Sequence, residues 1–238
     1  MVFERGRLAS TPIAKEIFVL ILALPFCLCA IAQAQGEVGY ADGTPFLHRL
    51  LDEANSWSDY SCLTEMHNIK PHSITVTHTK LIYKKGPQVR IEIQGGFRHG
   101  TVLARNAEGK CSGRGGFFLG GIPIKIEPNS NMLNLPSGYN ALRADFPETY
   151  AEMKELVGKG YMCKYTPEPV EDSELGKKVV LLELYAPDRF MTEKVYLSPD
   201  EKHLPLRWDS LKEGRVKSKT WFRNMKINTG VKDQLFKL

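Results

Sequence analysis

Short runs of alternating apolar and polar residues, separated by turn residues, recur along most of this chain. In the clearest run, Val89, Ile91 and Ile93 alternate with Arg90 and Glu92. A period of two residues is typical of a β-strand that buries one of its faces. The recurrence of this pattern predicts a mainly β fold.

Several other segments combine strand-like composition with flanking residues that favour turns. Residues 179–184 are apolar at every position except Glu183, so we expect this strand to be covered on both faces. Strands are predicted over residues 58–66, 74–83, 89–93, 101–105, 122–126, 161–165, 178–185, 194–197, 204–210 and 216–227.

Two segments have helical spacing instead. The first follows Thr44 as N-cap and Pro45 at the first helical position. Its apolar residues are Phe46, Leu47, Leu50, Leu51 and Ala54. The second runs from about Pro147 to Val157, with Asp145 before it and Gly158 just past its end. Each helix must pack its apolar face on another element.

Successive strands interrupted by two helices predict an α+β architecture in which β structure dominates. We expect a curved, unclosed antiparallel β-barrel whose concave face is covered by the short helices. Residues 113–121 are rich in glycine around Phe117, Phe118 and Leu119. This segment predicts a bend or bulge in the sheet, or a mobile flap.

The amino-terminal segment has the order of a secretory signal peptide. Arg5, Arg7 and Lys15 precede an apolar stretch over residues 17–31, and small residues follow it. The stretch is shorter than the about 20 residues of a membrane-spanning helix, although a retained anchor is the alternative. We therefore predict a signal peptide over residues 1–34, cleaved near Ala32 or Ala34, a single exported domain over residues 35–238, and a periplasmic location.

The charge of the chain is modest overall and concentrated near the carboxyl terminus. Removing residues 1–34 takes away three basic and two acidic side chains, so the formal net charge falls from +5 to +4. Residues 207–238 hold nine Lys or Arg against Asp209, Glu213 and Asp233. This excess indicates either a solvated basic face or a surface for an anionic membrane or an envelope protein. Export argues against nucleic acid as a partner.

Cys62, Cys111 and Cys163 lie within the predicted domain. An oxidising compartment allows one disulfide among the three, in any of the three pairings, with one thiol left over. Three free, partly buried thiols are the alternative. The spacing matches neither a redox motif nor a zinc site.

Motifs for catalysis or cofactor binding are absent from the sequence. There is no G-x-S-x-G nucleophile elbow, and Phe118 stands where the third glycine of a phosphate-binding loop belongs. The six histidines form no helical pair with metal-ligand spacing. We therefore predict no cofactor, no metal and no enzymatic activity. An exported hydrolase whose catalytic groups assemble only in the fold is the alternative.

An incomplete barrel would gather apolar side chains on its concave face. This face becomes either an ordinary core, filled by the protein's own helices, or a pocket for acyl chains. The residues predicted to line it are Ile74, Val76, Val89, Ile91, Ile93, Phe117, Phe118, Leu119, Leu181, Val195, Trp208 and Phe222.

The order of these features resembles the family of periplasmic lipoprotein carriers and outer-membrane lipoprotein-sorting proteins, which is related to the amino-terminal domain of an envelope stress sensor. The resemblance rests on the leader, the helix near residues 46–54, Tyr60 with the first strand, and the hairpin over residues 81–92 around Lys85-Gly86-Pro87. Towards the carboxyl terminus it rests on the segments 195–199, 204–205, 220–222, 227–228 and 235–236. It implies an unclosed barrel with a helical lid over a cavity for lipid acyl chains.

The dedicated carriers of this family have an arginine directly before the hairpin proline, where it helps to hold the lid shut. This chain has Gly86 at that position, and Arg90 is the nearest candidate for a lid contact. The resemblance implies an envelope protein that carries or senses lipid or lipoprotein acyl chains. The alternative is a non-catalytic interaction or stress-sensing module that uses the basic carboxyl-terminal strands.

Overall fold

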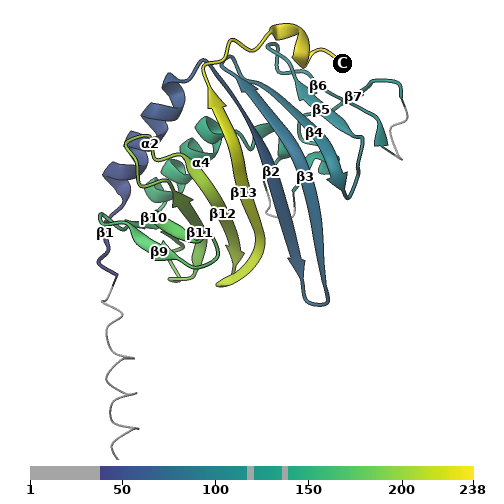
Figure 1. Cartoon of the computed structure of the whole chain (residues 1–238). Coiled ribbons are helices and arrows are strands. Elements are labelled where there is room, and N and C mark those ends of the chain that lie inside the picture. The colour runs from purple at the N-terminus through teal and green to yellow at the C-terminus, as the bar shows by residue number, and fades with distance from the viewer. Residues whose placement is uncertain (1–37, 117–120, 136–138) are drawn as a thin grey trace, which may run out of the picture. The chain divides into compact units, whose positions relative to one another are not determined.

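The alternating segments assemble into one antiparallel sheet that stays open at both ends. The computed structural model describes residues 38–116, 121–135 and 139–238, of which residues 39–238 form one unit. Within these residues the sheet has 13 strands. Figure 1 shows it curving around two helices. The predicted fold class is therefore confirmed, as mainly β with an unclosed antiparallel sheet.

The path of the sheet runs β1-β8-β10-β11-β12-β13-β2-β3-β4-β5-β6-β7, with β9 paired to β10. The strands are β1 (Ala41–Asp42), β2 (Asp59–Lys70), β3 (Ser73–Lys84), β4 (Gln88–Gly96), β5 (Val102–Arg105), β6 (Cys111–Arg114), β7 (Ile124–Ile126), β8 (Met162–Tyr165), β9 (Val170–Asp172), β10 (Lys177–Tyr185), β11 (Met191–Leu197), β12 (Pro205–Lys212) and β13 (Arg215–Ile227). The predicted strands are present, and β1, β6 and β9 are additional.

Helix α2 (Thr44–Ser56) begins one residue earlier than predicted, with Gly43 rather than Thr44 at the N-cap. A side chain at residue 43 would meet strand β8, because a Cβ there would lie 2.8 Å from Cys163 Sγ. The close approach of the chain to β8 thus places glycine at the cap. The apolar residues predicted for the helix are buried.

Helix α4 (Phe146–Gly158) starts at the predicted cap, since the backbone N–H of Glu148 donates to Asp145 Oδ1 at 3.0 Å. It ends one residue later than predicted, because Gly158 is still helical and Lys159 is the C-cap. The described residues also include three short 3-10 turns: η1 (Asn131–Leu133), η2 (Ala141–Arg143) and η3 (Asp233–Phe236).

Strand β10 is covered on both faces, as predicted. Leu182 and Leu184 are fully buried in the main core with α2 and α4, whereas Val179 and Leu181 form a second cluster with Tyr196 on the other face. Side chains around β9, including Val170, pack over this second cluster. The added strand β9 therefore explains the unbroken apolar composition of β10.

Candidate functional site

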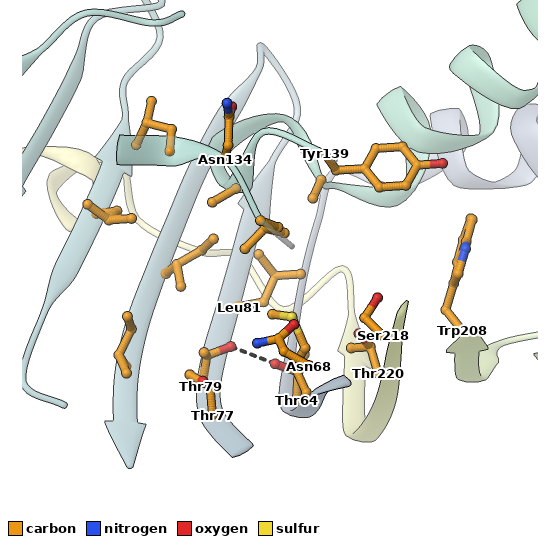
Figure 2. Close-up of a pocket in the computed structure, with 18 of the residues that line it drawn as sticks. Thr64, Asn68, Thr77, Thr79, Leu81, Asn134, Tyr139, Trp208, Ser218 and Thr220 are labelled. Atoms are coloured by element: carbon orange, nitrogen blue, oxygen red, sulfur yellow. Dashed lines mark hydrogen bonds between the residues drawn. The ribbon is translucent and has the colours of Figure 1, made fainter. Parts of the chain in front are cut away.

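Part of the concave face of the sheet is hollow. A cavity of about 240 Å³ lies between the central strands and the segment that leads into α4 (Figure 2). Strands β2, β3, β4, β5, β12 and β13 supply one side, and residues from 132–135 and 139–149 contribute the other. Phe97 and Met132 line the cavity and are 57% and 45% exposed, so they mark its mouth.

One wall of the cavity is apolar. It is formed by Leu81, Ile91, Ile93 and Leu103 on β3, β4 and β5, and is called the apolar wall below. Cross-strand register makes these residues neighbours, because Leu81 pairs with Ile91 and Ile91 pairs with Leu103. Directly opposed side chains on one face are in contact distance, so this wall is continuous.

The adjoining wall carries hydroxyl and amide groups. It consists of Thr64, Asn68, Thr77, Thr79, Ser210, Ser218 and Thr220 and is called the polar wall below. Figure 2 shows most of these side chains on neighbouring strands, with a hydrogen bond of 2.6 Å between the hydroxyls of Thr64 and Thr79. Asn68 pairs in register with Ser218, which pairs with Ser210. The cavity is thus amphipathic.

The segment over the cavity is shaped by its own short polar side chains. The side chains of Ser130 and Asn140 each accept a hydrogen bond from the backbone N–H of the residue two positions later. These bonds cap η1 and η2. Leu133 is buried at 1% exposure and lines the cavity. The segment over residues 129–140 therefore has local order at its two ends, and residues 136–138 lie outside the described residues.

Glu193 on β11 ties this segment to the sheet. Its carboxylate accepts hydrogen bonds from Trp208 Nε1 at 2.7 Å, from Ser210 Oγ at 2.9 Å and from Tyr139 OH at 3.2 Å. All three donors line the cavity, and Glu193 lies behind them. Burial raises the pKa of Glu193 to about 7, against the lowering effect of the three donors.

Sequence reasoning missed Glu193 and the polar wall. Thr77 follows the apolar Val76 on a strand, and such alternation indicates a solvent-facing side chain. Glu193 lies directly before the predicted strand 194–197, between Thr192 and Lys194, where no pattern indicates burial. The available signal was Glu193 in register with Ser210, with Trp208 two residues earlier on β12, but that register becomes visible only once the strands are paired.

The structure separates the predicted lining residues into four groups. Ile91, Ile93, Trp208 and Phe222 line the cavity. Val89 and Val195 are fully buried in the main core, outside the cavity lining. Phe117, Phe118 and Leu119 lie outside the described residues.

Three other predicted lining residues point away from the cavity. Thr77 and Thr79 face it from β3, so the alternation of side chains puts Ile74 and Val76 on the opposite face, where Ile74 is 62% exposed. Leu181 belongs to the second cluster, on the far face of β10. In β3 and β10 apolar residues occupy both faces, and the sequence pattern does not distinguish them.

Arg90 does not contact a cover over the cavity. It alternates with Ile91 and lies on the convex face, where its Nη1 donates to the carbonyl oxygen of Leu235 at 2.7 Å and its Nε to Glu92 at 2.7 Å. Arg90 thereby holds η3 against β4. The predicted lid contact is corrected to a contact with the carboxyl-terminal segment.

Cys62, Cys111 and Cys163 are free and buried. They lie on β2, β6 and β8, which are not neighbours in the sheet, so the disulfide that an oxidising compartment would allow is not formed. Burial raises the pKa of the Cys62 thiol to about 12, which keeps it protonated and unreactive.

The basic carboxyl-terminal strands are partly neutralised on the convex face. Lys219 Nζ lies 2.7 Å from Glu174, and Arg223 Nη2 lies 3.2 Å from Glu65.

Within residues 38–116, 121–135 and 139–238, no group of three or more His, Cys, Asp or Glu residues is arranged to bind a metal ion. No helix in the same ranges has the length and hydrophobicity needed to cross a membrane.

Comparison with known proteins finds similarity at the level of structure. No family model matches the chain. No curated protein matches it in sequence.

Many solved structures resemble it, among them the following three. A LolA superfamily protein from Nitrosomonas europaea has a TM-score of 0.45 at 14% identity, over 81% of this chain and 97% of that one. A putative outer membrane lipoprotein-sorting protein domain from Vibrio parahaemolyticus has 0.41 at 12%, over 82% and 95%. The Mycobacterium tuberculosis lipoprotein LppX has 0.46 at 10%, over 80% and 97%. The first two belong by name to the lipoprotein-sorting family that the sequence resembles. At these identities, the similarity of the three structures to this chain shows a shared fold only.

Proposed function

We propose that this protein binds amphiphilic molecules by their acyl chains and carries or senses lipids or lipoproteins in the cell envelope. The observation that supports this most directly is the cavity on the concave face, with an apolar wall and an exposed mouth beside a buried hydrophobic core. A pocket with mostly apolar lining and a few placed polar groups is typical of small-molecule binding.

The energy for such binding comes from removing the chain from water. Each CH₂ group that is transferred to an apolar environment contributes ~0.8 kcal/mol. A carrier therefore needs apolar surface and room rather than specific charge contacts. The predicted leader would bring the protein to the compartment where lipids and lipoproteins are sorted.

The lining favours binding over catalysis. Among the described residues that line the cavity, Arg98 has the single charged side chain, and it lies at the exposed mouth. Glu193 is behind the wall with its oxygens occupied by three donors. No pair of titratable groups converges on one point of the described lining, as acid and base catalysis would require.

Docking of an envelope protein or an anionic membrane through the basic strands is a separate proposal with less support, because Lys219 and Arg223 are paired with carboxylates of the same face. If the protein has such a partner, the contact adds to acyl binding and does not replace it.

Titration with a fluorescent fatty acid tests the proposed function. The purified protein should enhance probe fluorescence saturably, and Ile93→Trp, which fills the cavity from the apolar wall, should abolish the enhancement. Leu63→Trp places the same side chain on the convex face of β2, where Leu63 is 38% exposed, and serves as the matched control. Equal binding by all three proteins would contradict the proposal.

A further inference from the structure

The polar wall is unusual in a cavity for acyl chains. A chain of CH₂ groups makes no hydrogen bonds, so hydroxyl and amide groups that it covers lose their contacts with water. The cavity nevertheless has such groups on β2, β3, β12 and β13. Thr64 and Thr79 bond to each other, and Ser210 donates to Glu193. The part of the ligand that meets the remaining groups of this wall must therefore be polar.

Asn68 is the group in this wall whose bonding is incomplete. Its side chain lines the cavity from β2, and the residue is 8% exposed. Its Oδ1 is buried and has no hydrogen-bond partner among the described residues. A buried acceptor without a donor costs free energy, and a donor supplied from within the cavity would recover it.

The neighbours of Asn68 extend this polar surface across three strands. Ser218 lies beside it in register, and Ser210 lies beside Ser218. Thr77 pairs with Gly96, directly before Phe97 at the mouth. The polar wall therefore reaches the entrance, whereas the apolar wall continues along β4 and β5.

The electrostatics of the wall select against a charged headgroup. None of its members is ionisable. Behind it the Glu193 carboxylate is held by three donors, and the one cation of the described lining, Arg98, lies at the exposed mouth, where its Nη1 donates to the carbonyl oxygen of Met132. A phosphate placed against Asn68 would be desolvated with no cation among the members of the polar wall to pair with it.

We infer that the ligand is a neutral amphiphile whose headgroup carries hydroxyl or amide N–H donors. The headgroup binds to Asn68 and the neighbouring hydroxyls near the mouth, and the acyl chain lies along the apolar wall. This inference rests on the proposed function and adds to it the chemical class of the headgroup.

Three probes with the same chain test the inference: monolauroylglycerol, methyl laurate and lauroyl lysophosphatidic acid. Each displaces the fluorescent fatty acid from the purified protein, and the apparent Kd is measured. Monolauroylglycerol should bind about tenfold more tightly than methyl laurate, as one or two net hydrogen bonds predict, and more tightly than the phosphate-bearing probe.

Asn68→Leu should remove this preference while retaining binding of methyl laurate. Since Oδ1 has no partner to lose, the variant should fold as well as the parent. Thr220→Val, which removes one hydroxyl of the wall without changing its shape, should reduce the preference several-fold and serves as a second variant. Asn55→Leu makes the same exchange at an exposed position of α2 and should change nothing.

The outcomes separate this inference from the proposed function. Equal binding of monolauroylglycerol and methyl laurate, or a preference that survives both wall variants, overturns the headgroup assignment and leaves acyl binding intact. Tighter binding of the phosphate-bearing probe overturns the neutral class. Failure of all three probes to bind overturns both proposals.

Discussion

The two halves of the concave face are built from the same sheet, yet one is filled and the other is hollow. On β10 and β11, Leu182 and Val195 are fully buried under the helices. On β3 and β4, Leu81, Ile91 and Ile93 face a cavity of about 240 Å³. Both halves display apolar side chains, and the difference lies in what covers them.

Coverage follows from the number and length of the helices. Helices α2 and α4 pack against each other, and each has 13 residues, so it is about 20 Å long. A sheet of 13 strands has more concave surface than two such helices can cover. The remaining surface is roofed by the irregular segment before α4, which encloses space without filling it. An open barrel with few helices thus contains both a stabilising core and a binding cavity.

Truncation of one apolar side chain in each half should show the difference between the two halves most clearly. Leu182→Ala removes a side chain with no exposure and should lower the free energy of unfolding by about 3 to 4 kcal/mol. Ile93→Ala, in the hollow half, should cost less than about 1 kcal/mol, because one side of Ile93 already faces empty space. Urea denaturation measures both. Equal losses would show that the hollow half is packed as tightly as the filled half.

Glu193 stands at the boundary between the halves and should make stability depend on pH. Its folded pKa is about 7, above the ordinary 4.5, so the stability it contributes is full below pH 4.5 and is lost as the pH rises through 7. The loss should reach up to about 3 kcal/mol. Glu193→Gln has no carboxyl to ionise and should lack this loss. The measurement is the free energy of unfolding of both proteins from about pH 5 to about pH 8. A constant difference between them would contradict the assigned pKa.

A charge placed in the hollow half should impair binding more than folding. Ile93→Asp puts a carboxylate on the apolar wall and should weaken fatty-acid binding at least tenfold, a change of about 1.4 kcal/mol. Leu63→Asp introduces the same charge on the convex face and should leave affinity unchanged. Fluorescence titration gives both values. A similar loss in the two variants would place the acyl site elsewhere.

The smallest effects should come from the ion pairs on the convex face. Lys219→Ala and Arg223→Ala should each change stability by less than about 0.5 kcal/mol, because their pairs are partly exposed, and should not alter acyl binding. Sedimentation with anionic vesicles at low and high salt tests whether Lys219 and Arg223 dock the protein on an anionic membrane. Salt-sensitive binding that both variants abolish would favour a docking surface on these strands.

Local patterns were sufficient to predict the sheet and both helices. The alternation over residues 89–93 indicated strand β4 and placed Ile91 and Ile93 on one face, which is the face that lines the cavity. The strand β6 was missed because its short sequence contains Gly113 and lies beside a glycine-rich segment. Glycine weakens any strand pattern.

The cavity itself was only partly predictable. Apolar composition identified candidate lining residues, but Leu181 lies in a strand without alternation, and its face is decided by β9 on the other side. Asn68 and Glu193 have the composition of solvent-facing positions, and their burial depends on pairings between distant strands. Whether a concave face is filled is determined by what covers it, which no local pattern records.

Mass spectrometry of lipid that accompanies the protein tests the central claim most directly. The full chain is expressed in bacterial cells and purified without detergent, and the organic extract is compared with that of Ile93→Trp prepared in the same way. The account predicts a defined acyl-bearing species in the wild-type extract that is absent from the variant. Lipid-free wild-type protein, or the same lipid in both extracts, would contradict it.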